Sequence, residues 1–267
     1  MTKSGKNNFC IISFGDNIKP GVYKLHSAFQ KVRNYNNGIN LISLVLEDIG
    51  EGPNNIVVPF LPDFAKIEIK KNKFYSDNII AEIERKYFSK ISEEFKIEKN
   101  ILNFCVFALL KYSPPLSMSF VFDEKRRFNF KTGFQKQMFK KMQRGVKFLI
   151  KKDYVSGTRA LRGLGFGLTP SGDDFLSGLV LAMRLKKDYK EAKLILDNFK
   201  TKNILSYNAL INCFEKKVDG KIKNFINSVK MKNKKNILKA LKDSVNKGHT
   251  SGSDFLSGFL FYFYLKL

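Results

Sequence analysis

The most constraining feature of this 267-residue chain is an internal repeat in its C-terminal half. Residues Thr169–Gly178 read TPSGDDFLSG, and residues His249–Gly258 read HTSGSDFLSG. Within the last eight positions the copies differ only at Asp173, where the second copy has Ser253. An apolar segment follows each copy. The repeat therefore predicts one loop–helix unit that occurs twice, with the two copies facing each other about a pseudo-two-fold axis.

Each copy has the pattern of a helix start. Ser171 is a good N-cap residue, and Asp174 three positions later would complete a capping box; Ser251 and Asp254 repeat this spacing. The glycine that ends each copy lies inside the predicted helix, where it costs about 1 kcal/mol relative to alanine. A glycine is tolerated there if two backbones approach closely. Capping and close packing would explain the repeat without any chemistry.

A glycine-rich loop precedes the first copy, with Gly163, Gly165 and Gly167 alternating before Thr169. Its N–H groups could point at an anion, with the positive end of the following helix behind them. The spacing matches neither a dinucleotide-binding fingerprint nor a phosphate-binding loop that ends in lysine. The residues predicted to bind phosphate or substrate are Arg162, Gly163, Gly165, Gly167, Thr169, Ser171, Gly172, Ser251, Gly252, Asp254 and His26.

Two adjacent carboxylates, Asp173 and Asp174, stand at the predicted helix start, where the helix dipole favours their ionised form. Either they hold a hard cation such as Mg²⁺ through oxygen ligands, or they accept hydrogen bonds from an amide or carbamoyl NH₂ group. Asp254 would add a third carboxylate if the two copies converge. Asp173 and Asp174 are predicted to be catalytic, and no organic cofactor is expected.

Only two histidines occur, and both are candidates for proton transfer because histidine titrates near neutral pH. His249 heads the second copy of the repeat and is the predicted catalytic histidine. His26 follows a strand-like run. Capping or packing at a helix end is the alternative for His249.

The chain carries 48 basic and 24 acidic residues, a formal charge of +24, yet this excess does not predict specific nucleic-acid binding. Lysines are spread along the whole chain and outnumber arginines, whereas bidentate contacts to phosphate and guanine favour arginine. In the most basic stretches the apolar residues recur at helical spacing, so the lysines lie on solvated faces. A general attraction for small anionic substrates is the more modest inference.

Periodicity predicts an α+β protein with a β-rich N-terminal half and a helical C-terminal half. Residues 126–267 contain a series of amphipathic helical stripes, and a soft boundary is predicted near residue 125, which separates regions 1–125 and 126–267. Within the first region a helix is expected over 78–97, and 101–112 fits helix or strand equally well. The predicted strands, bounded by turn signals, are Phe9–Phe14, Val22–Phe29, Asn40–Leu46, Asn55–Phe60 and Phe64–Lys70.

The cellular setting is predicted to be the cytoplasm. Three widely separated cysteines (Cys10, Cys105 and Cys213) match neither a zinc module nor a disulfide framework, and fit a reducing compartment. The N-terminal residues contain no apolar targeting segment, and no run of about 18 apolar residues predicts a membrane helix.

The sequence GLGFGLTPSGDDFLSG (Gly163–Gly178), with GHTSGSDFLSG (Gly248–Gly258) downstream, resembles the bacterial family that contains the oxamate carbamoyltransferase subunit AllH. The segment Tyr23–Leu44, the Gly52-Pro53 pair and Thr201–Ser206 are also similar to the family pattern, although less specifically than the glycine-rich motif.

The resemblance implies a catabolic carbamoyltransferase that acts in allantoin and purine degradation. Phosphate would cleave oxalurate to oxamate and carbamoyl phosphate. The resemblance also implies two partner subunits, one related to FdrA and one from another uncharacterised family. The alternatives are a transferase that acts on another ureido acid and a non-catalytic scaffold subunit of a multi-subunit complex.

Overall fold

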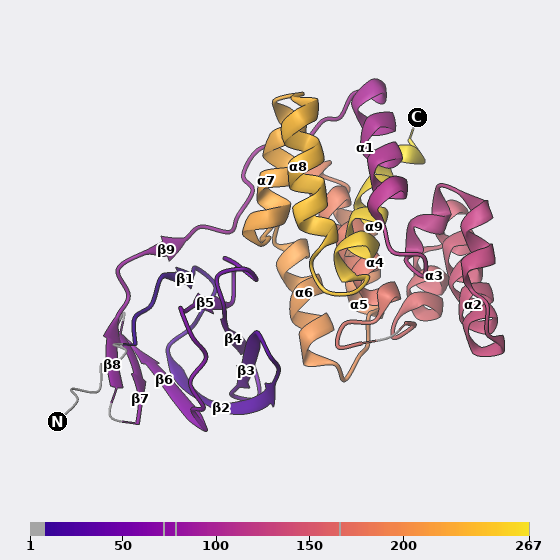
Figure 1. Ribbon diagram of the computed structural model, residues 1–267. Coiled ribbons are helices and arrows are strands. Elements are labelled where there is room, and N and C mark those ends of the chain that lie inside the picture. The colour runs from indigo at the N-terminus through magenta and orange to yellow at the C-terminus, as the bar shows by residue number, and fades with distance from the viewer. Residues whose placement is uncertain (1–8, 72, 78, 166, 267) are drawn as a thin grey trace. The chain divides into compact units, whose positions relative to one another are not determined.

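A computed structural model describes residues 9–71, 73–77, 79–165 and 167–266 (Figure 1). The chain divides into two compact units, residues 1–89 and 90–267. The first unit contains the strands and the second contains the helices, so the predicted α+β class is confirmed. The boundary predicted near residue 125 falls inside the second unit. The reason is that α1 (Lys99–Tyr112) buries Ile101, Leu102 and Cys105 in the helical core.

The first unit is a curled, mixed nine-stranded sheet with the order β8-β7-β6-β2-β3-β4-β5-β1-β9. The β4–β5 and β1–β9 pairs are parallel, and the other pairs are antiparallel. The strands are β1 (Ser13–Gly15), β2 (Gly21–Ala28), β3 (Val32–Asn36), β4 (Leu41–Val45), β5 (Asn55–Val57), β6 (Lys66–Lys70), β7 (Lys73–Ser76), β8 (Ile79–Glu82) and β9 (Lys86–Tyr87).

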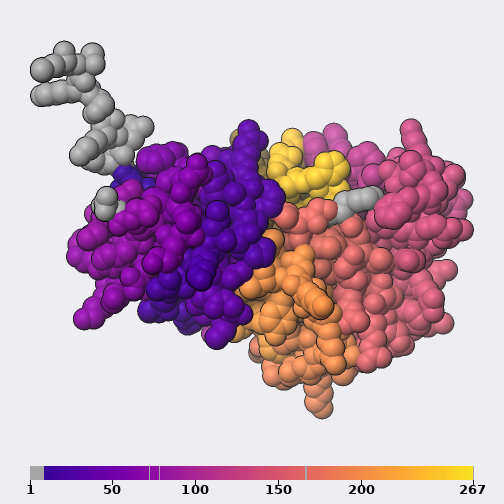
Figure 2. Space-filling view, turned by 90° about the horizontal axis from the view of Figure 1, so that it is seen from below, coloured from indigo at the N-terminus to yellow at the C-terminus, as the bar shows by residue number. Residues whose placement is uncertain are grey.

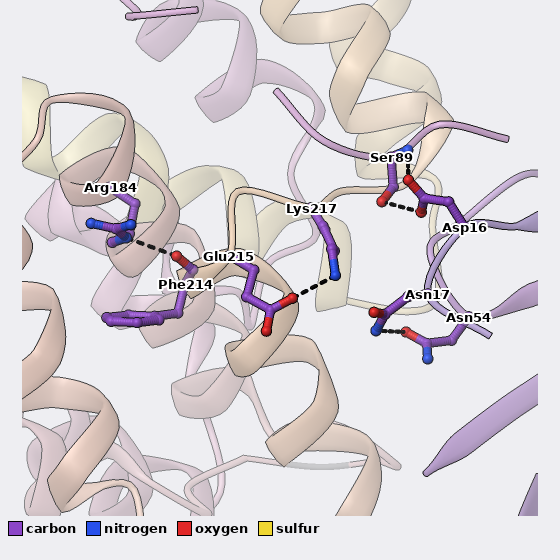
Figure 3. A network of polar contacts seen from close by, with 8 residues as sticks. All are labelled: Asp16, Asn17, Asn54, Ser89, Arg184, Phe214, Glu215 and Lys217. Carbon is purple, nitrogen blue, oxygen red and sulfur yellow. Dashed lines mark hydrogen bonds and ion pairs between the residues drawn. The ribbon is translucent and has the colours of Figure 1, made fainter. Parts of the chain in front are cut away.

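The curled sheet encloses its own apolar core, in which Tyr23, Tyr35 and Phe74 are fully buried. A polar contact lies next to the β1–β9 pair. The Asp16 carboxylate accepts hydrogen bonds from the backbone N–H of Ser89 at 3.0 Å and from its hydroxyl at 2.6 Å (Figure 3). The end of the first unit is therefore tied back to the turn after β1.

The helix predicted over 78–97 is wrong. Among the described residues of this segment, β8 and β9 pair with neighbouring strands, and an irregular stretch follows. The apolar residues here have helical spacing, but pairing with β7 and β1 satisfies the backbone in the sheet instead. The first strand also begins later than predicted, at Ser13, and the strand β3 was not predicted.

The second unit is a bundle of helices around one apolar core. Its α-helices are α1 (Lys99–Tyr112), α2 (Gly133–Ile150), α3 (Tyr154–Leu161), α4 (Ser171–Leu185), α5 (Tyr189–Asn198), α6 (Ile204–Phe214), α7 (Gly220–Lys230), α8 (Lys234–Val245) and α9 (Ser251–Tyr264), and two 3₁₀ helices, η1 (Met118–Val121) and η2 (Glu124–Asn129), follow α1. No helix in the described part of the chain is both long and apolar enough to cross a membrane.

The helices α4 and α9, which begin with the two copies of the repeat, lie side by side in the centre of the bundle (Figure 1). Every residue of α4 except Arg184 is buried, as expected for a helix that is covered on all sides. At the far end of α4, Arg184 Nε donates a hydrogen bond of 2.7 Å to the Phe214 carbonyl at the end of α6 (Figure 3). This contact fixes the end of α4 that lies away from its motif.

The two glycines that end the repeat copies are the points of closest approach. A Cβ atom on Gly178 would lie 2.0 Å from the Phe255 carbonyl oxygen, and one on Gly258 would lie 1.9 Å from the Phe175 carbonyl oxygen. These two contacts exchange under the 80-residue offset, so α4 and α9 are related by a pseudo-two-fold axis. The predicted close approach and the predicted symmetry are both present.

Candidate functional site

The N-termini of α4 and α9 converge, and each brings one aspartate into the space between the two helices. Asp174 is 6% exposed and Asp254 is fully buried. The Asp174 carboxyl interacts with the hydroxyls of Thr169 and Ser251, and the Asp254 carboxyl interacts with those of Ser171 and Thr250. We call Asp174 and Asp254 the carboxyl pair. Each member interacts with hydroxyls from both copies of the repeat.

The four hydroxyls, from Thr169, Ser171, Thr250 and Ser251, form what we call the hydroxyl cluster. Thr169 Oγ1 lies 3.3 Å from Ser251 Oγ, and Ser171 Oγ lies 3.4 Å from Thr250 Oγ1. All but the buried Ser171 are partly exposed. Figure 2 shows yellow atoms of the C-terminal part of the chain at the surface beside salmon atoms of the part around α4. The hydroxyl cluster therefore lies between solvent and the buried carboxyl pair.

The capping boxes predicted for Ser171 and Ser251 are wrong. Both serines are the first residues of their helices, and the N-cap positions are held by Pro170 and Thr250, neither with a side-chain capping bond. The serine hydroxyls interact instead across the helix pair, with the hydroxyl and carboxyl groups of the other copy. The partner motif competes with the helix for these side chains, and local spacing cannot show that competition.

Burial favours the protonated form of both carboxyls of the pair. Burial raises the pKa of Asp174 well above its ordinary value, and the nearby Asp254 raises it further, while the Ser251 hydroxyl opposes the shift. Burial raises the pKa of Asp254 to about 7, against the opposing Met118 N–H and Ser171 hydroxyl. The carboxyl pair therefore keeps at least one proton at neutral pH.

Asp254 is also fixed by a segment far away in the sequence. Its Oδ1 accepts a hydrogen bond of 2.5 Å from the backbone N–H of Met118 at the start of η1. The second carboxyl oxygen of Asp254, like that of Asp174, is buried with no hydrogen-bond partner among the described residues. Buried polar atoms are normally hydrogen-bonded, so these two oxygens mark the pair as unusual.

Asp173 has a different position from its neighbour. Its Oδ1 accepts a hydrogen bond of 2.6 Å from the Gly163 N–H, and its carboxyl also interacts with the Ser206 hydroxyl. Burial raises the pKa of Asp173, and the Gly163 N–H opposes that shift. Adjacent helical residues point in directions about 100° apart, so Asp173 and Asp174 face different surroundings. Asp173 anchors the glycine-rich loop.

The glycine-rich loop is held against the start of α4. Gly163, Gly165 and Gly167 all have positive φ, and a Cβ atom on Gly165 would lie 2.3 Å from the Ser171 nitrogen. The Gly172 N–H donates to the Leu164 carbonyl at 2.8 Å. The first N–H groups of a helix have no partner within the helix, so the loop supplies one for Gly172. Gly172 itself approaches the Leu161 carbonyl so closely that a Cβ atom would lie 2.0 Å from its oxygen.

Arg162 contacts backbone carbonyls, and both histidines are exposed. Arg162 donates to the backbone carbonyls of Asn198 and Lys200, at 3.2 and 3.1 Å, and so ties the loop to the end of α5. His249 is exposed in the turn before α9. His26 is exposed on β2 of the first unit, with Nδ1 3.2 Å from Ser27 Oγ. Their predicted roles stay predictions.

The remaining predicted residue, Gly252, is buried in the first turn of α9. Its N–H donates to the Lys247 carbonyl at 3.1 Å, and a Cβ atom would lie 1.8 Å from the Ser244 oxygen. Gly252 and Gly172 therefore have equivalent roles, because the N–H of each donates to a carbonyl of the segment that precedes its own helix. Both glycines shape the hydroxyl cluster through the backbone.

Sequence reasoning missed Lys247, which lies two residues before His249. Its Nζ forms an ion pair of 2.6 Å with Asp219, and the two side chains are 41% and 16% exposed. Burial alone lowers the pKa of Lys247, but the Asp219 carboxylate outweighs it and the net shift is upward, with a further contribution from Asp174. No spacing rule marks this lysine among the 40 in the chain.

Residues 161–263 match the family model described as oxamate carbamoyltransferase subunit AllH. The resemblance to the AllH family is confirmed over this segment. The matched residues 161–263 begin at the last residue of α3 and include the glycine-rich loop, both copies of the repeat and Lys247. No curated protein and no solved structure matches the chain significantly. The family is defined as a subunit, which implies a multi-subunit complex.

Proposed function

We propose that this chain is a subunit of an oxamate carbamoyltransferase complex that uses phosphate to cleave oxalurate into oxamate and carbamoyl phosphate, in the degradation of allantoin and purines. The match to the AllH family supports the assignment to the complex. The single observation that supports a site within this chain is the convergence of two helix N-termini on the carboxyl pair and the hydroxyl cluster.

The hydroxyl cluster is suited to an anion such as phosphate. Each helix N-terminus carries a partial positive charge, and two of them act together here. Ionised aspartates behind the cluster would repel phosphate. The raised pKa values of Asp174 and Asp254 reduce this repulsion, because a protonated carboxyl is neutral.

The proposed reaction also needs a proton. A phosphate oxygen forms a bond to the terminal ureido carbon of oxalurate, and the bond from that carbon to the inner nitrogen breaks. The departing nitrogen takes up one proton to become the amide of oxamate, and the attacking hydrogen phosphate loses one. Asp254, with a pKa near 7, is placed to deliver the first proton through Ser171 or Thr250 and to recover the second.

The other predicted residues take supporting roles in this proposal. Gly163, Gly165 and Gly167 are retained as substrate-binding residues, and Asp173 holds Gly163 in place. His249 is exposed and directly precedes Thr250 of the hydroxyl cluster. It is retained as a candidate for stabilising charge on the carbonyl oxygen of the ureido group of oxalurate. The partners we propose are an FdrA-like subunit and a subunit of the second uncharacterised family.

The predicted ligands of Mg²⁺ are Asp173 and Asp174, and a bound Mg²⁺ stays a prediction. Over the described residues, no group of three or more His, Cys, Asp or Glu side chains is arranged to hold a metal ion. Asp173 and Asp174, the predicted ligands, face different surroundings. We therefore route no step of the proposal through a metal ion.

The test is phosphate-dependent consumption of oxalurate, measured as carbamoyl phosphate formed. The chain is assayed alone and co-expressed with its genomic neighbours, with and without Mg²⁺. We expect turnover in the complex and a loss of about 100-fold or more in kcat for Asp254→Asn, because the amide cannot transfer the proton. Asp188→Asn, at the N-cap of α5 where the carboxylate pairs with Lys266, is the control and should keep its turnover.

A scaffold role is the second candidate function. The observation that favours it is the burial of the second carboxyl oxygens of Asp174 and Asp254, which have almost no contact with solvent. A complex that contains Asp254→Asn or Asp174→Asn and turns over at the wild-type rate would place the active site in a partner subunit. A complex that cleaves a different ureido acid but not oxalurate would keep the site and change the substrate.

A further inference from the structure

Lys247 is held in place at both its backbone and its side chain. Its carbonyl oxygen accepts the Gly252 N–H in the first turn of α9, at 3.1 Å. Its ammonium group lies 2.6 Å from Asp219 Oδ2, and the other carboxyl oxygen of Asp219 accepts the Ile222 N–H at the start of α7. Two helix starts therefore fix the position of this one lysine.

The surroundings of Lys247 connect it to the carboxyl pair. The charged and titratable groups that act on it are Asp219 before α7, Asp174 on α4 and the buried thiol of Cys213 on α6. Burial raises the pKa of Cys213, so the thiol is neutral. Lys247 is thus the cation that acts on Asp174, and its side chain keeps 41% of its surface exposed.

The proposed reaction needs more positive charge than two helix N-termini supply. Each helix end is equivalent to roughly half a unit charge, whereas hydrogen phosphate carries about two negative charges and oxalurate adds a carboxylate. An ammonium group has three N–H donors, and Asp219 accepts only one of them. Lys247 precedes Thr250 of the hydroxyl cluster by three residues, and its carbonyl is bonded to the first turn of α9 beside Ser251. Its ammonium group, held by a carboxylate, therefore keeps donors free for phosphate near this cluster.

We propose that Lys247, oriented by Asp219, is the cationic ligand of phosphate at the hydroxyl cluster. This inference rests on the proposed function for the identity of the anion. It assigns Lys247 as a residue that touches substrate and Asp219 as a positioning residue. The ion pair is then a device that holds the ammonium group ready between α7 and the start of α9.

The first measurement is binding of inorganic phosphate to the full chain by isothermal titration calorimetry. A hydrogen bond to a charged group contributes about 1.5–3 kcal/mol, so Lys247→Met should weaken phosphate binding by about ten-fold or more. Lys247→Arg should retain most of the affinity. Lys239→Met, on the exposed face of α8, removes one positive charge elsewhere and should bind phosphate like the wild type.

The second measurement separates binding from folding. In the complex, Lys247→Met should raise the KM for phosphate and leave the KM for oxalurate nearly unchanged. Asp219→Asn should raise the KM for phosphate by a smaller factor, because the lysine remains but loses its orientation. Urea unfolding of each variant shows whether the helical unit is intact.

The outcomes separate this inference from the proposed function. Equal phosphate affinities for Lys247→Met and Lys239→Met, or no phosphate binding by the wild-type chain, would overturn the role of Lys247 even if oxalurate is cleaved. Phosphate binding that depends on Lys247, without cleavage of oxalurate by any complex, supports the inference and contradicts the reaction. A raised KM for oxalurate alone would also overturn the inference.

Discussion

The starts of α4 and α9 have nearly the same sequence but receive the chain in different ways. At α4, the glycine-rich loop arrives from α3 and is anchored by Asp173, which accepts the Gly163 N–H. At α9, a short turn arrives from α8, and Ser253 takes the place of Asp173 with its buried hydroxyl lacking a partner among the described residues. Both starts still place one aspartate in the carboxyl pair.

The difference shows which part of the repeat is constrained by packing. The glycines that end the copies, the serines that precede them and the aspartates of the carboxyl pair occupy equivalent positions about the pseudo-two-fold axis. Ser177 and Ser257 even make the same bond, to the carbonyl four residues earlier, at 2.9 and 2.7 Å. The segments that precede the two helices differ: a glycine-rich loop precedes α4, and a turn that contains Lys247 and its ion pair with Asp219 precedes α9.

The largest effect is expected where the two copies touch. Gly178→Ala and Gly258→Ala would each place a Cβ atom about 2 Å from a backbone oxygen of the other helix. The helices must then separate, and we expect each substitution to lower the free energy of unfolding by about 3 kcal/mol or more. Urea denaturation of the full chain measures this.

The control for that prediction is Gly133→Ala at the start of α2, where a Cβ atom would meet nothing within 4 Å. Its stability should change by no more than about 1 kcal/mol. If one motif glycine tolerates alanine and the other does not, the pseudo-two-fold equivalence of the two contacts is broken.

The next effect is a dependence of stability on pH. An aspartate in the unfolded chain has a pKa of about 3.9, whereas that of Asp254 in the folded chain is raised to about 7. The folded state therefore binds the extra proton between these values, and stability is lost as the pH rises from about 4 to 7. We expect Asp254 to account for a decrease of about 2–4 kcal/mol over this range.

Unfolding in urea at pH 5 and pH 8 checks this, with Asp254→Asn beside the wild type. The variant should show a smaller decrease. Asp219→Asn is the control that should keep the wild-type decrease between pH 5 and pH 8, because Lys247 lowers the pKa of Asp219 and the contribution of this carboxylate is lost only below about pH 4. An unchanged pH dependence in Asp254→Asn would mean that this carboxyl is ionised in the folded chain.

The smallest effect is expected from making the first copy more like the second. Asp173→Ser removes the acceptor of the Gly163 N–H, and we expect a loss of about 1–2 kcal/mol together with faster hydrogen exchange at Gly163. Ser253→Ala, the corresponding change in the second copy, should alter stability by about 0.5 kcal/mol or less. Equal effects of the two substitutions would show that Asp173 has no special role in holding the loop.

Local sequence patterns predicted the helical unit well and part of the sheet. Helical spacing of apolar residues marked most helices of the second unit, because each buries one face in a common core, but it left 101–112 open between helix and strand. The same reasoning failed over 78–97, where residues with helical spacing form β8 and β9. Sheet pairing joins segments far apart in the chain, such as β1 and β9, and no local pattern contains that information.

The sequence by itself determined that one loop–helix unit occurs twice and that the two copies face each other about a pseudo-two-fold axis, because nearly identical segments pack in equivalent ways. Only the tertiary structure decided that Asp173 and Asp174 face different surroundings, that Ser171 and Ser251 do not cap their helices, and that the Met118 N–H binds Asp254. Folding brings Met118 to Asp254 although 136 residues separate them in the sequence. The other contacts depend on how each copy of the repeat packs against the loop or the copy beside it. Burial also sets the protonation of the carboxyl pair, because the cost of a charge depends on the atoms that surround it in space.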